Sequence, residues 1–252
     1  MNNPLRDGYA PQAGAQTAAG IDEGLRAYML KVYNYMALGL AITGIAAMGL
    51  FQLAVVQDAS GDIVGLTGIG EAIYTSPLRW VIMLAPLGAV FFLSFRIQAM
   101  SVSAAQITFW LFAAIMGASL SSIFLVYTAE SITRVFFITS AAFGALSLWG
   151  YTTKKDLSGW GSFLFMGLIG VVIASVVNIF LGSSALQFAI SVIGVLVFAG
   201  LTAYDTQRIK TMYYEGDGAE TMGKKAIMGA LSLYLNFINM FIMLLQLFGN
   251  RE

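Results

Sequence analysis

The residue best placed to do chemistry in this 252-residue chain is Asp205, the one acidic residue set within a long apolar stretch. It lies in the segment VFAGLTAYDTQRIK, and Arg208 follows three residues later on the same helical face. A carboxylate inside a membrane is costly and marks a functional site by default. Two interpretations stand: a functional carboxylate in the protein interior, or an ion pair with Arg208 or Lys210 near the membrane surface.

A second group of polar residues lies in the C-terminal apolar segment GALSLYLNFINMFIMLLQLF. Its members are spaced by four, three and seven residues, which puts them on one helical face: Ser232, Asn236, Asn239 and Gln246. Such a stripe faces a bundle interior or a wet cavity, or simply joins helices by hydrogen bonds. Asn236 and Asp205 lie at similar predicted depths, roughly 16 Å and 13 Å from their helix boundaries, so the two side chains can meet.

Seven apolar stretches must position these side chains, each close to the roughly 20 helical residues that cross a hydrocarbon core of about 30 Å. Unpaired backbone groups are costly in lipid, so the stretches are predicted to be helices. The sixth should continue past Tyr204, because a helix that ended there would place Asp205 where the dipole disfavours negative charge. The stretches are Tyr33–Val56, Leu78–Phe95, Ala105–Val126, Ile132–Trp149, Phe163–Leu181, Gln187–Tyr204 and Ala226–Phe248.

Composition supports a membrane protein, since 58% of the residues are hydrophobic and only 10% are charged, against roughly 25% charged in soluble domains. No linker interrupts the helices, so we expect one all-α transmembrane domain over residues 29–250. Residues 1–28 are predicted to form a disordered cytoplasmic tail, rich in Ala, Gly and Gln. The first apolar stretch is too long for a cleaved signal peptide and is predicted to remain as an anchor.

Basic residues divide unequally between the two sides of the predicted bundle. The side with the N-terminus and the connections after the second, fourth and sixth helices carries ten, and the other side carries three. The positive-inside rule therefore places the N-terminus in the cytoplasm and the C-terminus outside. The ten are Arg6, Arg26, Lys31, Arg96, Lys154, Lys155, Arg208, Lys210, Lys224 and Lys225, and the three are Arg79, Arg134 and Arg251.

The residue types also exclude several kinds of site. The chain has no Cys and no His, which removes disulfides, thiol nucleophiles, Cys/His zinc sites and Ser-His-Asp triads. An intramembrane aspartyl protease needs two carboxylates that share a proton, and these helices offer one. We therefore expect neither enzymatic activity nor a cofactor. The net charge of zero gives no indication of nucleic-acid binding.

Five runs of the sequence are familiar: MLAPLGAVFFLSF, GASLSSIFLVY, FGALSLWGYTTKKDLSGWGSFLFMGLIG, GVLVFAGLTAYDTQRIK and ALSLYLNFINMFIMLLQLFG. They resemble the Bax inhibitor (transmembrane Bax inhibitor motif) family, in its bacterial YccA-like branch. The resemblance covers about residues 20–250, and the AYDTQ and LYLxFIN segments are its most specific parts. It implies seven transmembrane helices, the last surrounded by the other six.

The resemblance also implies a pH-sensitive calcium leak, gated by one aspartate in the sixth helix and one in the seventh. Asp205 matches the first, but Asn236 stands where the family pattern has the second aspartate. Two close carboxylates cannot both ionise easily, which makes such a pair a proton sensor. An Asp–Asn pair has one titrating group and offers a divalent cation one charge rather than two.

Two functional interpretations remain. In the first, the chain is a pH-sensitive cation leak channel with Ca²⁺ as permeant ion, gated near Asp205 and Asn236. Arg208, Asn239 and Ser232 would also line the ion pathway, and Asp205 is a candidate Ca²⁺ ligand. In the second, the chain conducts nothing and modulates membrane-protein quality control or stress survival, with a membrane protease or another membrane protein as partner. A proton-coupled transporter is a more distant alternative. The family branch suggests a bacterial inner membrane, and the predicted partners are the lipid bilayer, Ca²⁺ and protons.

Overall fold

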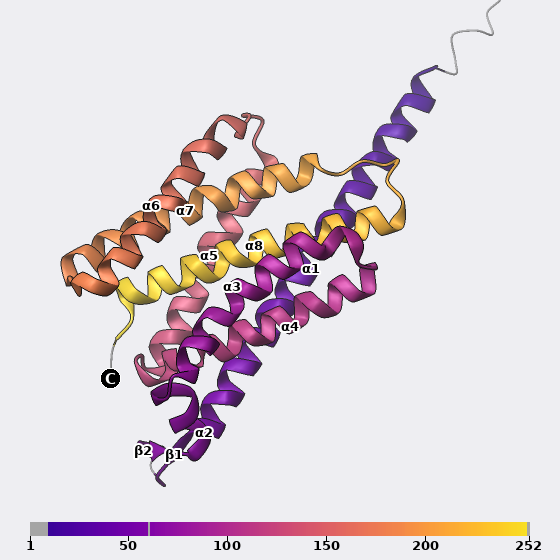
Figure 1. The fold of residues 1–252 in the computed structure, drawn as a ribbon. Helices are drawn as coiled ribbons and strands as arrows, with labels where there is room; N and C mark the ends of the chain where they lie inside the picture. The colour runs from indigo at the N-terminus through magenta and orange to yellow at the C-terminus, as the bar shows by residue number, and fades with distance from the viewer. Residues whose placement is uncertain (1–9, 60, 251–252) are drawn as a thin grey trace, which may run out of the picture.

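The computed structural model describes residues 10–59 and 61–250, most of which lie in long helices (Figure 1). In that part of the chain, seven helices are long and apolar enough to cross a membrane. This confirms the predicted all-α membrane fold. The seven are α1 (Ala10–Ala54), α3 (Leu78–Arg96), α4 (Val102–Leu120), α5 (Ala129–Thr152), α6 (Ser158–Leu181), α7 (Ser184–Thr211) and α8 (Ala219–Phe248). Short 3-10 turns extend two of them, η2 (Ile97–Ala99) after α3 and η3 (Ser121–Leu125) after α4.

The first helix is longer than its apolar stretch, because α1 begins at Ala10. Residues 10–28 are therefore helical, where the sequence predicted a disordered tail; residues 1–9 of that tail lie outside the described residues. The Ala, Gln, Glu and Leu residues of this segment are good helix formers, which a prediction from polarity alone overlooks. Tyr28 already lies in the core, with its ring 5.8 Å from that of Tyr213.

The connection between the first two membrane helices has structure that the sequence did not predict. β1 (Val55–Gln57) pairs antiparallel with β2 (Ile63–Leu66), so β1 takes the last two residues predicted for the first helix. The turn between them includes Gly61 at φ 89°, a conformation that favours glycine. The connection ends with α2 (Gly68–Gly70) and the π-helical turn η1 (Glu71–Thr75).

α8 is the central helix and the most buried of the seven. α1, α4, α5 and α7 pack directly against it, while α3 and α6 lie further out, mainly against α4 and α7 respectively (Figure 1). The last helix is thus central, as expected, with four of the six others as its main neighbours. On one side, the ring of Tyr234 packs edge-on against Phe109 and Phe112 of α4. Its hydroxyl group lies 2.6 Å from that of Thr43 on α1.

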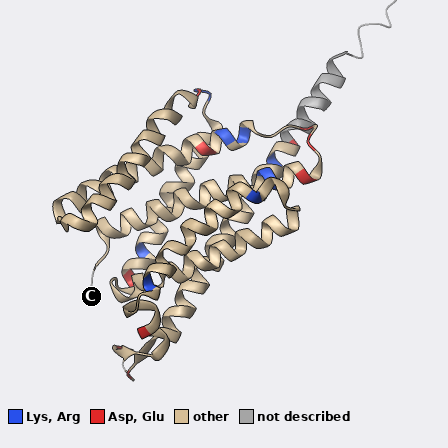
Figure 2. Ribbon diagram, in the orientation of Figure 1, with Lys and Arg blue, Asp and Glu red and all other residues tan. Residues whose placement is uncertain are grey.

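Charged residues gather toward the two ends of the helices, with a wide uncharged zone between them (Figure 2). In that zone the outer helices expose large apolar side chains, such as Ile45, Leu111 and Ile173. A surface of this kind is suited to lipid rather than to water. The bundle therefore has two polar ends, and the C-terminal part of α7 brings Asp205 toward one of them.

Candidate functional site

The C-terminal part of α7 holds Asp205 inside the helix rather than at its end. α7 continues to Thr211, so the prediction of a sixth helix that runs past Tyr204 is confirmed. Asp205 is buried, with 7% of its surface exposed. Arg208 lies in the last turn of the same helix, where the helix dipole favours a cation.

The carboxylate of Asp205 contacts both α7 and α8. Its Oδ1 lies 3.0 Å from Nη2 of Arg208, and its Oδ2 accepts a hydrogen bond of 2.8 Å from Nδ2 of Asn236. Asn236 is itself buried at 5% exposed, while the Arg208 side chain is 48% exposed. Nη2 of Arg208 also donates to Oγ of Ser232 at 3.3 Å. We call Asp205, Arg208, Ser232 and Asn236 the charged cluster.

The structure supports part of each interpretation of Asp205, the interior carboxylate and the ion pair. The residue lies in the interior and meets α8 at Asn236, as the similar predicted depths allowed. It also forms an ion pair, and its partner is Arg208. Lys210, the other base considered, instead donates to the backbone carbonyl of Tyr151 on α5 at 2.8 Å. The ion pair thus joins a buried carboxylate to an arginine that reaches back along α7 and stays about half exposed.

A cleft of about 540 Å³ opens beside the charged cluster, between α6, α7 and α8. Its polar wall comes from the charged cluster and Asn239, and its apolar wall includes Phe165, Phe198 and Leu235. Asn239 lines the cleft as predicted but does not touch Asp205 through a hydrogen bond, because its Nδ2 donates to the carbonyl of Leu235 in its own helix. Four predicted residues are therefore brought into direct contact, and the fifth lies nearby.

The oxygen atoms around this cleft could hold a cation only weakly. No group of three or more Asp, Glu, His or Cys side chains comes together anywhere in residues 23–59 and 61–250. The available side-chain ligands are the carboxylate of Asp205 and the neutral oxygens of the other lining residues, which are Ser162, Tyr204, Ser232, Asn236 and Asn239. Ca²⁺ prefers six to eight oxygens with several charges among them, so this arrangement suits a transient contact rather than a resident ion.

A second polar group lies at the other end of α7 and α8, and the sequence did not predict that its members meet. Oε1 of Gln246 accepts hydrogen bonds of 2.8 Å from both Nε2 of Gln187 and Oγ of Ser191. Oε1 of Gln187 in turn accepts from Nδ2 of Asn178 on α6 at 3.1 Å. We call these four residues the amide cluster. Gln246 thus belongs to a different site from Asn236, and the predicted stripe on α8 divides in two.

Apolar side chains separate the two clusters along the interface between α7 and α8. Asn236 and Gln246 are ten residues apart on α8, or roughly 15 Å at 1.5 Å per residue. Phe198 and Met240 are buried in this interval. Gly194 of α7 lies so close to Met243 of α8 that an added Cβ would stand 3.0 Å from the methionine Cγ. Among the described residues, no side-chain hydrogen bond joins the charged cluster to the amide cluster.

Comparison with known proteins places the chain in a large group of similar membrane proteins. A family model described as "Inhibitor of apoptosis-promoting Bax1" matches residues 25–252. An uncharacterised protein of Rickettsia prowazekii is 49% identical over 92% of each chain, and one of Caulobacter vibrioides is 47% identical over 99% of this chain and all of its own. The inner membrane protein YbhL of Escherichia coli K12 is 46% identical over 91% of this chain and 94% of its own.

Proposed function

The chain belongs to the Bax inhibitor family, and we propose that it acts as a cation leak channel, with Ca²⁺ as its principal ion, gated at the charged cluster. The single observation that carries this proposal is the buried carboxylate of Asp205 beside a cleft, neutralised by a half-exposed arginine. A buried carboxylate is a costly feature for a structure that only needs to pack helices.

The proposed gate works by competition between two cations for one carboxylate. Arg208 occupies the position beside Asp205 that a metal ion would otherwise take. Its side chain is 48% exposed, so it can swing toward solvent at small cost. A carboxylate has about four lone-pair directions, and the contacts with Arg208 and Asn236 use only two of them. An entering Ca²⁺ can therefore bind the free side of Asp205 and replace Arg208.

Conduction also requires the interface between α7 and α8 to open. In the structure the apolar interval at Phe198, Gly194 and Met243 is tightly packed, and in our proposal this packing is the closed state. No ion pair between described residues joins α7 to α8 in this interval. Moving the two helices apart there would therefore break only dispersion contacts. When Ca²⁺ displaces Arg208 from Asp205, the hydrogen bond from Arg208 on α7 to Ser232 on α8 is also lost, and this step would favour separation.

The proposed channel has a weaker pH response than the two-aspartate pattern of the family implies. Asn236 donates a hydrogen bond to Asp205 and does not titrate. The cluster therefore has one titrating carboxylate, whereas a pair of carboxylates would titrate as a coupled unit.

We place this channel in the inner membrane, with support from the name of the similar protein YbhL of Escherichia coli. The ten-to-three division of basic residues supports a cytoplasmic N-terminus and an external C-terminus. In that orientation the charged cluster faces the cytoplasm and the amide cluster the outside. Cysteine labelling of single-cysteine variants tests the orientation, since the native chain has no thiol.

The direct test of function is Ca²⁺ flux into liposomes that contain the purified chain and an internal Ca²⁺ dye. We expect flux above that of protein-free liposomes, and a loss of about tenfold or more in Asp205→Asn, which leaves the charge of Arg208 to repel cations. Glu130→Gln is the matched control, since Glu130 is an exposed acidic residue on α5 outside the cleft. Flux equal to that of empty liposomes would favour the non-conducting interaction protein instead.

A further inference from the structure

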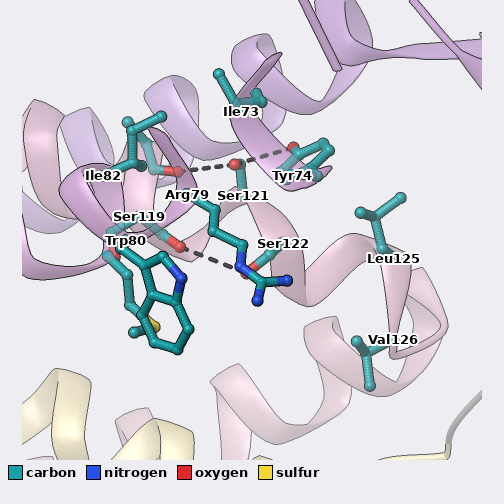
Figure 3. A pocket seen from close by; sticks show the side chains of 12 residues that line it. Ile73, Tyr74, Arg79, Trp80, Ile82, Ser119, Ser121, Ser122, Leu125 and Val126 are labelled. Atoms are coloured by element: carbon teal, nitrogen blue, oxygen red, sulfur yellow. Dashed lines mark hydrogen bonds between the residues drawn. The ribbon is translucent and has the colours of Figure 1, made fainter. Parts of the chain in front are cut away.

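Figure 3 shows the side chains that line a second pocket, of about 450 Å³. Its lining residues lie at the end of the bundle away from the charged cluster. Its walls come from three segments: the π-helical turn η1, the first turns of α3, and the junction of α4 with η3. We propose that this pocket binds the headgroup of an anionic phospholipid, with Arg79 as the residue that contacts the phosphate. The proposal is independent of the proposed channel activity.

The floor of the pocket is a fixed polar contact. Tyr74 donates its hydroxyl hydrogen to Oγ of Ser121 at 3.0 Å, and Ser121 donates to the carbonyl of Ala118 at 2.7 Å. Ser121 is fully buried. Burial raises the pKa of Tyr74, so the phenol keeps its proton and remains a donor at neutral pH. These bonds join η1 to the end of α4 and do not involve the side chains of Arg79, Ser119 or Ser122.

The remaining polar groups are donors suited to an anion. Figure 3 shows the guanidinium of Arg79 extending toward Ser122, with Trp80 beside it. Arg79 forms no ion pair with an acidic residue in residues 23–59 and 61–250; its guanidinium carbon lies 4.9 Å from the ring centroid of Trp80. The hydroxyl group of Ser119 also lines the pocket, and that of Ser122 makes only a long contact of 3.5 Å to a carbonyl. One cation and two hydroxyls match the acceptors of a phosphate.

The position of the pocket favours a lipid over a soluble anion. Arg79 and Trp80 occupy the first turn of a membrane helix, and Trp80 is half-exposed. Tryptophan and arginine at this level mark the boundary between headgroups and acyl chains. The rest of the lining is apolar, with Ile82 and Met83 on α3 and Leu125 and Val126 after α4. A lipid fits this combination, because its phosphate contacts Arg79 while its glycerol and upper acyl chain cover the apolar wall.

The test measures which lipid the full chain retains. The protein is purified in neutral detergent, mixed with equal amounts of phosphatidylglycerol and phosphatidylcholine, and analysed by native mass spectrometry. We expect a preference for phosphatidylglycerol of about tenfold, the change that one charge-assisted hydrogen bond supplies. Arg79→Gln should remove that preference and Arg79→Lys should keep part of it. Arg134→Gln is the matched control, an exposed arginine near the start of α5 that does not line the pocket.

Three results would overturn the proposal. The first is an equal preference for phosphatidylglycerol in wild type and Arg79→Gln. The second is an equal loss of preference in Arg79→Gln and Arg134→Gln, which would indicate general attraction to basic residues. The third is displacement of the lipid by the same concentration of inorganic phosphate, which would identify a site for soluble anions. Circular dichroism of each variant verifies that the helices remain folded.

Discussion

The two polar clusters on the interface between α7 and α8 share their helices but differ in charge. The charged cluster joins a carboxylate to a half-exposed arginine, and the amide cluster joins neutral groups only. In the amide cluster each of the two glutamine oxygens receives a hydrogen bond from another residue of the cluster, so the cluster ties α6, α7 and α8 together. In the charged cluster, the proposed channel requires that another cation replaces Arg208 as the partner of Asp205. The difference in charge suggests different roles: the amide cluster holds the helices together, and the charged cluster is the proposed site of cation exchange.

After Asp205→Asn, the largest difference between the two clusters is expected at Arg208. Arg208→Gln removes the internal competitor for Asp205 and should raise Ca²⁺ flux about fivefold, because a half-exposed ion pair contributes about 1 kcal/mol. Arg96→Gln is the control, an exposed arginine at the end of α3 that does not line the cleft. A fall in flux in Arg208→Gln would mean that the arginine attracts or positions something other than a competing cation.

The next largest effect is expected on the pH dependence of Ca²⁺ flux. Asn236→Asp places a second carboxylate against Asp205, so the two titrate as a coupled pair. We expect a steeper dependence of Ca²⁺ flux on pH than in wild type. Asn178→Asp adds the same group to the amide cluster and should leave the shape of the curve unchanged. Superimposable curves for Asn236→Asp and wild type would show that Asn236 only packs α8 against α7.

The smallest effect on flux is expected at the amide cluster. Gln246→Leu removes the acceptor of two hydrogen bonds and should lower stability by about 1–3 kcal/mol, because Gln187 and Ser191 lose a partner. Its flux should stay within about twofold of wild type. Thermal unfolding in detergent measures the stability, and Gln52→Leu on the exposed face of α1 is the control. A loss of Ca²⁺ flux without a loss of stability would indicate that the gate lies at the amide cluster.

The sequence predicted the charged cluster better than the amide cluster for a physical reason. A carboxylate in an apolar segment is rare and costly, so Asp205 stands out, and helical spacing connects it to Arg208. Gln187, at the very start of its apolar stretch, resembles an ordinary helix end. The spacing of Gln187 and Ser191 by four residues was the available signal, but only the packing of α7 on α8 shows that Gln246 faces them.

The sequence likewise predicted the long helices of the fold but not its short strands or the pocket near Arg79. Apolar length fixes which segments cross a membrane, so all seven helices were expected. The hairpin of β1 and β2 depends on pairing between two short strands, which carry little periodic signal of their own. The pocket at Arg79 likewise requires η1 and the end of α4 to meet in space. No local pattern in the sequence reports that contact.

The central claim is that cations pass where α7 and α8 separate, and a reversible crosslink tests it most directly. The native chain has no cysteine, and Gly194→Cys with Met243→Cys places two thiols across the apolar interval. An added Cβ at Gly194 stands 3.0 Å from Cγ of Met243, so the two Cβ atoms fall in the range of roughly 3.5–4.5 Å that a disulfide needs.

The measurement is Ca²⁺ flux in liposomes containing this double variant, before oxidation, after complete crosslinking and after reduction. We expect Ca²⁺ flux in the reduced protein and its loss when the crosslink holds α7 against α8. Reduction of the crosslink should restore the flux. Each single variant, treated identically, controls for the oxidant. Undiminished flux through the fully crosslinked protein would contradict the account.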